Sequence, residues 1–316
     1  MIKAESKSPG NIFLFGEHAV VYHKPAIIGS VGLYTKCTIN KLKNKEIIIY
    51  SKELGKAFCK NNIRKGKKDL FPLIDLCNFL LKKFKLECGL KIKIESQIPV
   101  ASGLSSSSAV LCSILHSFCK LFKLKLKNRD YYEYLIDFQK EIHGGKASGS
   151  EIISSSLGGL NYIYFHKNKL KYRQIKKGNK LIVVMGDTKI KTKTSKTVSF
   201  YIPELIKKNR RFINKSFNKI KLICEQSLPA FKKNDLIKLG QLLTKNQEIL
   251  KSLGLSHPKI DSAIKKALDA GAFGAKLSGK GQGGIMFALT DEKNKFLVAS
   301  AIKKSGLATK IIKIGV

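Results

Sequence analysis

The stretch Pro99-Val-Ala-Ser-Gly-Leu-Ser-Ser-Ser-Ser-Ala109 joins two segments of different periodicity. Before it, apolar and charged residues alternate and predict a strand over Leu90–Ile98; after it, apolar residues at helical spacing predict a helix over Ser106–Phe122. A glycine- and serine-rich turn from a strand into a helix gathers backbone N–H groups at the positive end of the helix dipole, which favours phosphate. No Gly-Lys-Ser/Thr follows, so the turn is not a Walker loop. A flexible loop is the common alternative for such a run.

Two further glycine-bearing segments are SPGNIFLFGEHAVVY at Ser8–Tyr22 and GAKLSGKGQGG at Gly274–Gly284. With the central stretch they resemble, in order and spacing, the three motifs of the GHMP family of small-molecule kinases, above all its archaeal mevalonate kinases. The resemblance extends over nearly the whole chain. It implies ATP and Mg²⁺ as cofactors and phosphorylation of the primary hydroxyl of mevalonate, in isoprenoid biosynthesis.

The bulk composition is that of an ordered globular protein. The chain has 316 residues, 43% of them hydrophobic, and no apolar run approaches the roughly 20 residues that span a bilayer. The N-terminal sequence shows no signal peptide, so we expect a cytoplasmic protein without a membrane partner. Seven scattered cysteines without a C-x-x-C pair indicate reduced thiols that pack as small core residues, and no cysteine–histidine spacing suggests zinc.

The charge is extreme: 60 lysines and arginines against 22 acids give a net charge of +38. Nucleic acid or another polyanion is the obvious partner for such a chain. The lysines are nevertheless spread along the whole sequence, without a basic tract interleaved with aromatic residues, and lysine dominates over arginine. This distribution favours solvated surface lysines, makes a nucleic-acid partner the weaker alternative, and would still attract anionic substrates.

The order of predicted elements indicates an α+β fold of two mixed sheets covered by helices. A charged stretch at Lys167–Lys180 predicts a division into domains at residues 1–170 and 171–316. The family resemblance implies a ribosomal S5-like N-terminal domain and a ferredoxin-like C-terminal domain. Further helices are predicted at Leu70–Phe84, Arg129–His143 (with Asn128 as N-cap), Glu151–Ser156, Thr197–Glu225, Asp235–Leu253, His257–Ala270 and Asn294–Ser305.

The resemblance also implies which residues hold the nucleotide. They lie in the central stretch and in the last glycine loop: Pro99, Ser102, Gly103, Leu104, Ser105, Ser106, Ser107, Ser108, Gly279, Gly281 and Gly283. Two positions depart from the family pattern, because Ser105 and Gln282 stand where glycine is usual. A side chain at Ser105 either crowds the phosphate or adds a donor.

Metal and base candidates follow from the same resemblance. Ser107 corresponds to the family's Mg²⁺-binding serine, although a simple N-cap is the alternative. Glu141 is the second candidate metal ligand, but it stands one residue nearer the next acid than the family spacing expects. Glu151 occupies the position of the catalytic aspartate and has the chemistry of a general base. A solvated acid at a helix start is the alternative for Glu151.

Asn11 is the largest departure from the family, whose mevalonate kinases have a catalytic lysine there. Asparagine donates hydrogen bonds but carries no charge, and losing one preorganised contact costs on the order of 100- to 1,000-fold in rate. Lys280, in the last glycine loop, could supply a substitute cation. A solvated loop lysine is the simpler interpretation.

Substrate contacts are implied for Glu17 and His18 in the first motif, and for Ser148 and Ser195. The serines also suit ordinary turns, and an isolated histidine is often structural. Two alternatives to a mevalonate kinase remain open: another GHMP kinase, such as one acting on phosphomevalonate, and a catalytically silent fold that binds nucleotides or polyanions. A homodimer is left open as well.

Overall fold

The structure is a computed structural model that describes residues 3–99, 102–175, 180–190 and 196–316. Two compact units are interleaved along the chain, and strands β1 (Lys3–Phe15) and β2 (Ala26–Leu42) contribute residues to both. The division at residue 170 stays a prediction. Unit 1 consists of Met1–Gly10, Leu33–Val100 and Ser106–Leu157, and unit 2 of Asn11–Gly32, Ala101–Ser105 and Gly158–Val316.

Unit 1 is built on a sheet in the order β2–β6–β3–β4–β5. Strand β3 runs parallel to β6, with Ile49 opposite Ile92, and the other neighbours are antiparallel. Because side chains alternate across a strand, one face carries buried residues such as Ile39 and the other carries exposed ones such as Lys93. The remaining bounds are β3 Ile47–Ser51, β4 Gly55–Lys60, β5 Ile63–Gly66 and β6 Gly89–Ser96.

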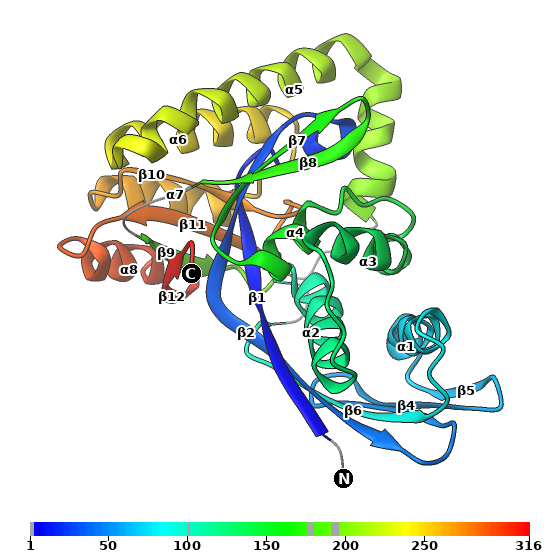
Figure 1. Cartoon of the computed structure of the whole chain (residues 1–316). Coiled ribbons are helices and arrows are strands. Elements are labelled where there is room, and N and C mark those ends of the chain that lie inside the picture. The colour runs from blue at the N-terminus through cyan, green and yellow to red at the C-terminus, as the bar shows by residue number, and fades with distance from the viewer. Residues whose placement is uncertain (1–2, 100–101, 176–179, 191–195) are drawn as a thin grey trace. The chain divides into compact units, whose positions relative to one another are not determined.

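Helices α1 to α4 complete the described part of unit 1. Helices α1 and α2 lie over the sheet (Figure 1), and both supply residues to its core. Their apolar spacing predicted them correctly. The predicted N-cap Asn128 is wrong: Asn128 is the first helical residue, and the Asp130 carboxylate accepts the Lys127 N–H at 2.7 Å. The bounds are α1 Phe71–Lys83, α2 Ser106–Leu121, α3 Asn128–His143 and α4 Ser150–Leu157.

Unit 2 contains an antiparallel sheet in the order β10–β11–β9–β12. The continuous apolar run Leu181–Met185 lies in β9, which is inside this sheet and is buried along most of its length. A second pairing joins β7 to the first part of β2, with β8 outside it. The bounds are β7 Leu160–His166, β8 Lys169–Gln174, β9 Leu181–Asp187, β10 Gly274–Ser278, β11 Ile285–Thr290 and β12 Ala308–Ile314.

The helices of unit 2 pack on this sheet through an apolar core that includes Phe217, Ile260 and Val298. A wider π-helical segment, Lys196–Tyr201, precedes α5, which is kinked at Asn209 (φ −152°, ψ 73°) and continues past Pro229. The mixed α+β class predicted from the sequence is confirmed. The helix bounds are α5 Ile202–Lys233, α6 Leu236–Ser252, α7 Pro258–Asp269 and α8 Lys295–Lys303.

All seven cysteines are buried and unpaired, as predicted, with 0–8% of each residue exposed. Across the part of the chain that the structure describes, no helix combines the length and apolar character needed to cross a membrane.

Candidate active site

The glycine turn before α2 brings the first and second motifs together within unit 2. The Asn11 backbone N–H donates to the Leu104 carbonyl oxygen at 3.1 Å, and both residues are fully buried. Gly103 and Ser105 adopt left-handed backbone conformations, with φ of 79° and 56°. The family's preference for glycine at position 105 therefore has a conformational basis, because a residue with a Cβ is strained there. Ser102 is buried in the same turn, and Pro99 is exposed after β6.

The last glycine loop, Gly279–Gly284, packs against this turn. A methyl group on Gly103 would lie 3.1 Å from the Ser278 carbonyl oxygen, and one on Gly279 would lie 3.1 Å from the Gly103 Cα. Such a close approach of two backbones needs glycine on both sides. The loop is held elsewhere by the Gln282 N–H, which donates to the Leu255 carbonyl oxygen at 2.7 Å.

The middle of this loop also requires glycine. A methyl group on Gly281 would lie 2.3 Å from the Leu255 carbonyl oxygen, and one on Gly283 would lie 2.7 Å from the Ile190 side chain. Gln282 adopts a left-handed φ of 57°, the second place where this chain has a larger residue at a position suited to glycine. Asn11 of the first motif, the turn Gly103–Ser105 and the last glycine loop thus lie together in unit 2.

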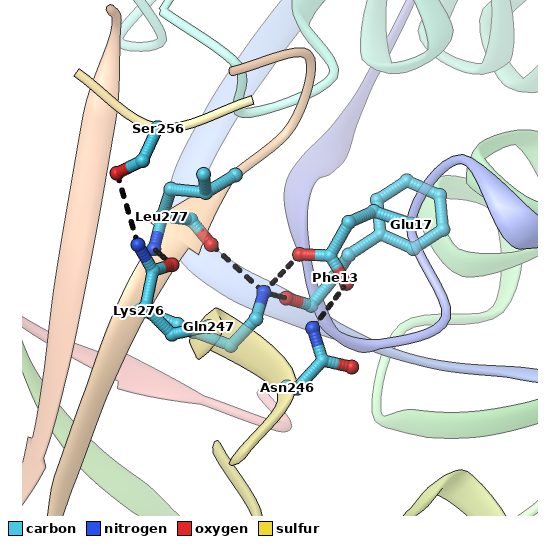
Figure 2. A network of polar contacts seen from close by, with 7 residues as sticks. All are labelled: Phe13, Glu17, Asn246, Gln247, Ser256, Lys276 and Leu277. Atoms are coloured by element: carbon cyan, nitrogen blue, oxygen red, sulfur yellow. Dashed lines mark hydrogen bonds and ion pairs between the residues drawn. The ribbon is translucent and has the colours of Figure 1, made fainter. Parts of the chain in front are cut away.

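A buried ion pair fixes the first motif to strand β10. The Lys276 ammonium contacts the Glu17 carboxylate and donates to the Phe13 and Leu277 carbonyl oxygens at 3.4 and 2.8 Å (Figure 2). The Lys276 and Glu17 side chains are 0% and 2% exposed. Asn246 donates to the second oxygen of Glu17 at 3.5 Å. Burial raises the pKa of Glu17 and lowers that of Lys276, and each charge opposes the effect of burial on the other.

A second chain of contacts braces the same strand from α6. The Leu277 N–H donates to the Gln247 side-chain oxygen at 2.9 Å, and the Gln247 amide donates to the Ser256 hydroxyl at 3.0 Å (Figure 2). Ser256 in turn donates to Asp261 at 2.6 Å. The strand that leads into the last glycine loop is therefore held on both sides by polar groups.

His18 lies beside this ion pair and is 6% exposed. Burial, followed by the charge of Lys276, lowers the pKa of His18 to about 4, while the backbone of Gly279 and Lys280 opposes that shift. The imidazole is consequently neutral near pH 7. The contacts of Glu17 and His18 with substrate stay predictions; in the structure both side chains also connect the first motif to the last.

A second polar cluster lies within unit 1, where α2, α3 and α4 meet. The Ser107 hydroxyl and the His143 Nε2 share a hydrogen bond of 3.0 Å, and the His143 Nδ1 lies 3.9 Å from the Glu151 Oε2. The His143 and Glu151 side chains are 12% and 20% exposed. The structure thus brings the predicted metal ligand Ser107 and the predicted base Glu151 to either side of one imidazole.

The Gln139 side chain also joins α3 to α2 and α4. Its amide nitrogen donates to the Ser108 hydroxyl and to the Glu151 Oε2, each at 2.8 Å, and the residue is fully buried. Neither Gln139 nor His143 was predicted as a site residue. The available signal was their spacing: they lie four positions apart on α3, and hence on one helix face, and a glutamine that replaces an apolar residue in a buried stripe needs polar partners.

The other predicted site residues lie apart from this cluster or outside the described residues. Glu141 is exposed. It is two positions from both Gln139 and His143, which puts it on nearly the opposite side of α3. The Ser148 hydroxyl shares a hydrogen bond of 2.7 Å with Ser150, at the start of α4. Ser195 lies outside the described residues. The metal role of Glu141 and the substrate roles of the two serines stay predictions.

The donor set suits a hard cation that is shared with phosphate. Ser107 and Glu151 present hydroxyl and carboxylate oxygens, the type of ligand that Mg²⁺ prefers, and Mg²⁺ commonly takes one or two protein oxygens together with substrate phosphates. Among the residues described, no three His, Cys, Asp or Glu side chains gather into an all-protein metal site. The residues present therefore fit Mg²⁺ that arrives with a nucleotide.

Comparisons with known proteins identify the family. Residues 72–159 match the model of the GHMP kinases N terminal domain, and residues 227–307 match that of the GHMP kinases C terminal domain. The mevalonate kinase of Pyrococcus abyssi is 30% identical over 98% of this chain and 96% of its own length. The crystal structure of Methanococcus jannaschii mevalonate kinase superposes with a TM-score of 0.81 at 25% identity and covers 98% of each chain.

A third comparison concerns a complex. The crystal structure of L. major mevalonate kinase with R-mevalonate superposes with a TM-score of 0.81, covering 98% of this chain and 95% of the other. At 22% identity this likeness supports the fold.

Proposed function

This chain belongs to the GHMP kinase family and is an ATP-dependent small-molecule kinase, and we propose that it phosphorylates the primary hydroxyl of mevalonate to give 5-phosphomevalonate for isoprenoid biosynthesis. One observation carries the choice of acceptor: 30% identity to a mevalonate kinase over 98% of the chain. Buried, unpaired thiols support a cytoplasmic location, where cysteines stay reduced.

The nucleotide phosphates are assigned to the glycine-bearing backbone. The turn Ser102–Ser105 and the first turn of α2, Ser106–Ser108, offer N–H groups and hydroxyls at a helix N-terminus. In the last loop, Gly279, Gly281 and Gly283 are assigned to the same phosphates through their backbone; the space that a Cβ would need at each is filled by Gly103, Leu255 and Ile190. In phosphoryl transfer such positioning and electrostatic support account for most of the catalysis.

Mg²⁺ would be held by the Ser107 hydroxyl together with phosphate oxygens. Glu141, the second ligand that the family implies, is exposed on the other side of α3 from His143. When bound, the ion neutralises charge that develops on the transferred phosphoryl group. The hydrogen bond between Ser107 and His143 fixes the rotamer of Ser107, which keeps its oxygen oriented.

The substrate proton is assigned to Glu151. Its Oε2 accepts a hydrogen bond from Gln139, which orients the carboxylate, and one-fifth of the side chain remains exposed. A carboxylate in this state can accept a hydroxyl proton as the oxygen attacks phosphorus. Asn11, which replaces the family's lysine, contributes its backbone N–H to the turn at Leu104, and its amide can donate a neutral hydrogen bond.

The test is a substrate screen with the purified protein. ATP and Mg²⁺ are offered with mevalonate, phosphomevalonate, homoserine or galactose, and products are identified by mass spectrometry. We expect 5-phosphomevalonate to form with the highest kcat/KM. Preference for phosphomevalonate or another alcohol would replace the acceptor but keep the kinase, and nucleotide binding without any transfer would leave a silent binding protein.

A further inference from the structure

Lys280 is a buried lysine within the last glycine loop. It lies between Gly279 and Gly281, whose φ values are 78° and 79°, and the residue is 7% exposed. Because Lys280 is buried, the simpler interpretation of the sequence, a solvated loop lysine, is wrong. Such burial is unusual, since lysine is among the residues least often buried. Burial also lowers the pKa of Lys280.

The surroundings of Lys280 in unit 2 are the other glycine motifs. The residue before it, Gly279, lies against Gly103 of the second motif, and the backbone of Gly279 and Lys280 faces the His18 ring of the first. Asn11 joins the first two motifs through Leu104. Lys280 thus lies where the segments assigned to substrate and nucleotide meet.

Two of the side chains at this place carry a positive charge. Lys276, four residues earlier, is also buried, but its charge is balanced by Glu17 and its remaining contacts are carbonyl oxygens (Figure 2). Asn11 is buried and uncharged. Of these three side chains, Lys280 is the one that carries a positive charge within the last glycine loop, which is assigned to the nucleotide phosphates.

We propose that the Lys280 ammonium binds an anionic oxygen of the reactants, and so supplies the positive charge that Asn11 does not. This inference rests on the proposed function, since it concerns the same site. An ammonium is a compact point charge on a flexible stem, able to meet either of two anions: the γ-phosphate of ATP or the carboxylate of the acceptor.

The variants Lys280→Met and Lys280→Arg separate charge from packing. Methionine keeps an unbranched stem without charge, and arginine keeps the charge. We expect Lys280→Met to lose about 100- to 1,000-fold in kcat/KM, as for removal of one preorganised electrostatic contact, and Lys280→Arg to retain more activity than Lys280→Met. Lys265→Met, on the exposed side of α7, removes the same charge as a matched control and should keep the wild-type kinetics.

Ligand binding by calorimetry identifies the anion. If it is the γ-phosphate, Lys280→Met weakens binding of a non-hydrolysable ATP analogue more than that of ADP and leaves mevalonate affinity unchanged. If it is the carboxylate, mevalonate affinity falls and both nucleotides bind as before. Wild-type kinetics and affinities for Lys280→Met would overturn the inference while leaving the kinase intact. A wild-type protein without phosphoryl transfer would instead sink the proposed function.

A measurement on the wild-type protein tests the proposal even if the Lys280 variants do not fold. Acylation of Lys280 by an amine reagent is followed by peptide mass spectrometry, with and without the ATP analogue or mevalonate. We expect one of these ligands to slow acylation of Lys280 at least several-fold, with Lys265 unaffected. Equal rates at Lys280 under all conditions would overturn the assignment.

Discussion

Glu151 and His143 of unit 1 lie 3.9 Å apart with side chains 20% and 12% exposed, whereas Glu17 and Lys276 of unit 2 are in contact with 2% and 0% exposed. The first pair stands at the junction of three helices and keeps access to solvent. The second is enclosed, and Lys276 donates to two carbonyl oxygens besides the carboxylate.

The difference in exposure between Glu151 and Glu17 indicates which acid can take part in a reaction. Charges out of contact with water interact strongly, and removing one partner leaves the other uncompensated. An enclosed pair therefore fixes geometry, while a partly exposed carboxylate can exchange a proton. On this argument Glu17 positions the first motif and Glu151 handles the proton.

The largest expected effect is on the enclosed pair. Lys276→Met leaves the Glu17 carboxylate buried without its cation, and we expect it to lower the free energy of unfolding by about 3–5 kcal/mol. Urea denaturation measures this. Lys93→Met, which breaks an exposed ion pair with Glu95, is the matched control and should cost less than about 1 kcal/mol.

Adding Glu17→Gln to Lys276→Met removes the uncompensated charge and should restore part of the lost stability. Equal costs for Lys276→Met and Lys93→Met would contradict the comparison, because they would place both pairs in similar surroundings.

The second largest effect is expected from protonation of His18, which lies beside the enclosed Glu17–Lys276 pair. Its pKa is about 4 in the folded state against an ordinary 6.5, so the unfolded chain binds one more proton between these values. Stability therefore falls as the pH drops from about 6.5 to 4, by about 3 kcal/mol from this group. His18→Asn removes this contribution and keeps a polar side chain at this position. Denaturation of both proteins at pH 4.5 and 7 measures the difference; parallel losses would argue against a buried neutral imidazole.

Much of the fold could be predicted because helices and buried strands repeat apolar residues at a fixed spacing. Strands β4, β5 and β8 could not be predicted in this way. β5 is exposed at every position, and β8 lies in the charged stretch read as a domain boundary. Such strands are held by backbone hydrogen bonds to a neighbouring strand, and the pattern of their side chains does not reveal this pairing.

The site could be predicted in part for a similar reason. Glycine and serine positions follow from local backbone needs, so the start of α2 at Ser106 was predicted correctly, while the roles of the motif residues stay predictions. The partner of Glu17 is Lys276, 259 positions away, and no local pattern joins them. Gln139 and His143 likewise gain their meaning from Ser107 and Glu151 on neighbouring helices.

Glu151→Gln tests the exposed half of the comparison. It removes the proton acceptor while keeping the shape of the side chain, and we expect turnover to fall at least about 100-fold, equivalent to about 2.7 kcal/mol. The free energy of unfolding should change by less than about 1 kcal/mol, because the pair is weakly coupled. Stopped activity with lost stability would instead assign Glu151 a structural role like that of Glu17, and wild-type turnover would remove it as base.

The smallest expected effect lies where the two units meet along the chain, between Ser105 and Ser106. Ser105 has a φ of 56°, a conformation that costs a residue with a Cβ about 1–2 kcal/mol, while glycine costs about 0.5–1 kcal/mol in chain entropy. Ser105→Gly should therefore stabilise the protein by roughly 0.5 kcal/mol. Ser106→Gly, one residue on but inside α2, should destabilise it by roughly 0.5 kcal/mol. Opposite shifts in the urea midpoint support a strained turn that ends at Ser105; shifts of one sign would mean that the strain does not stop there.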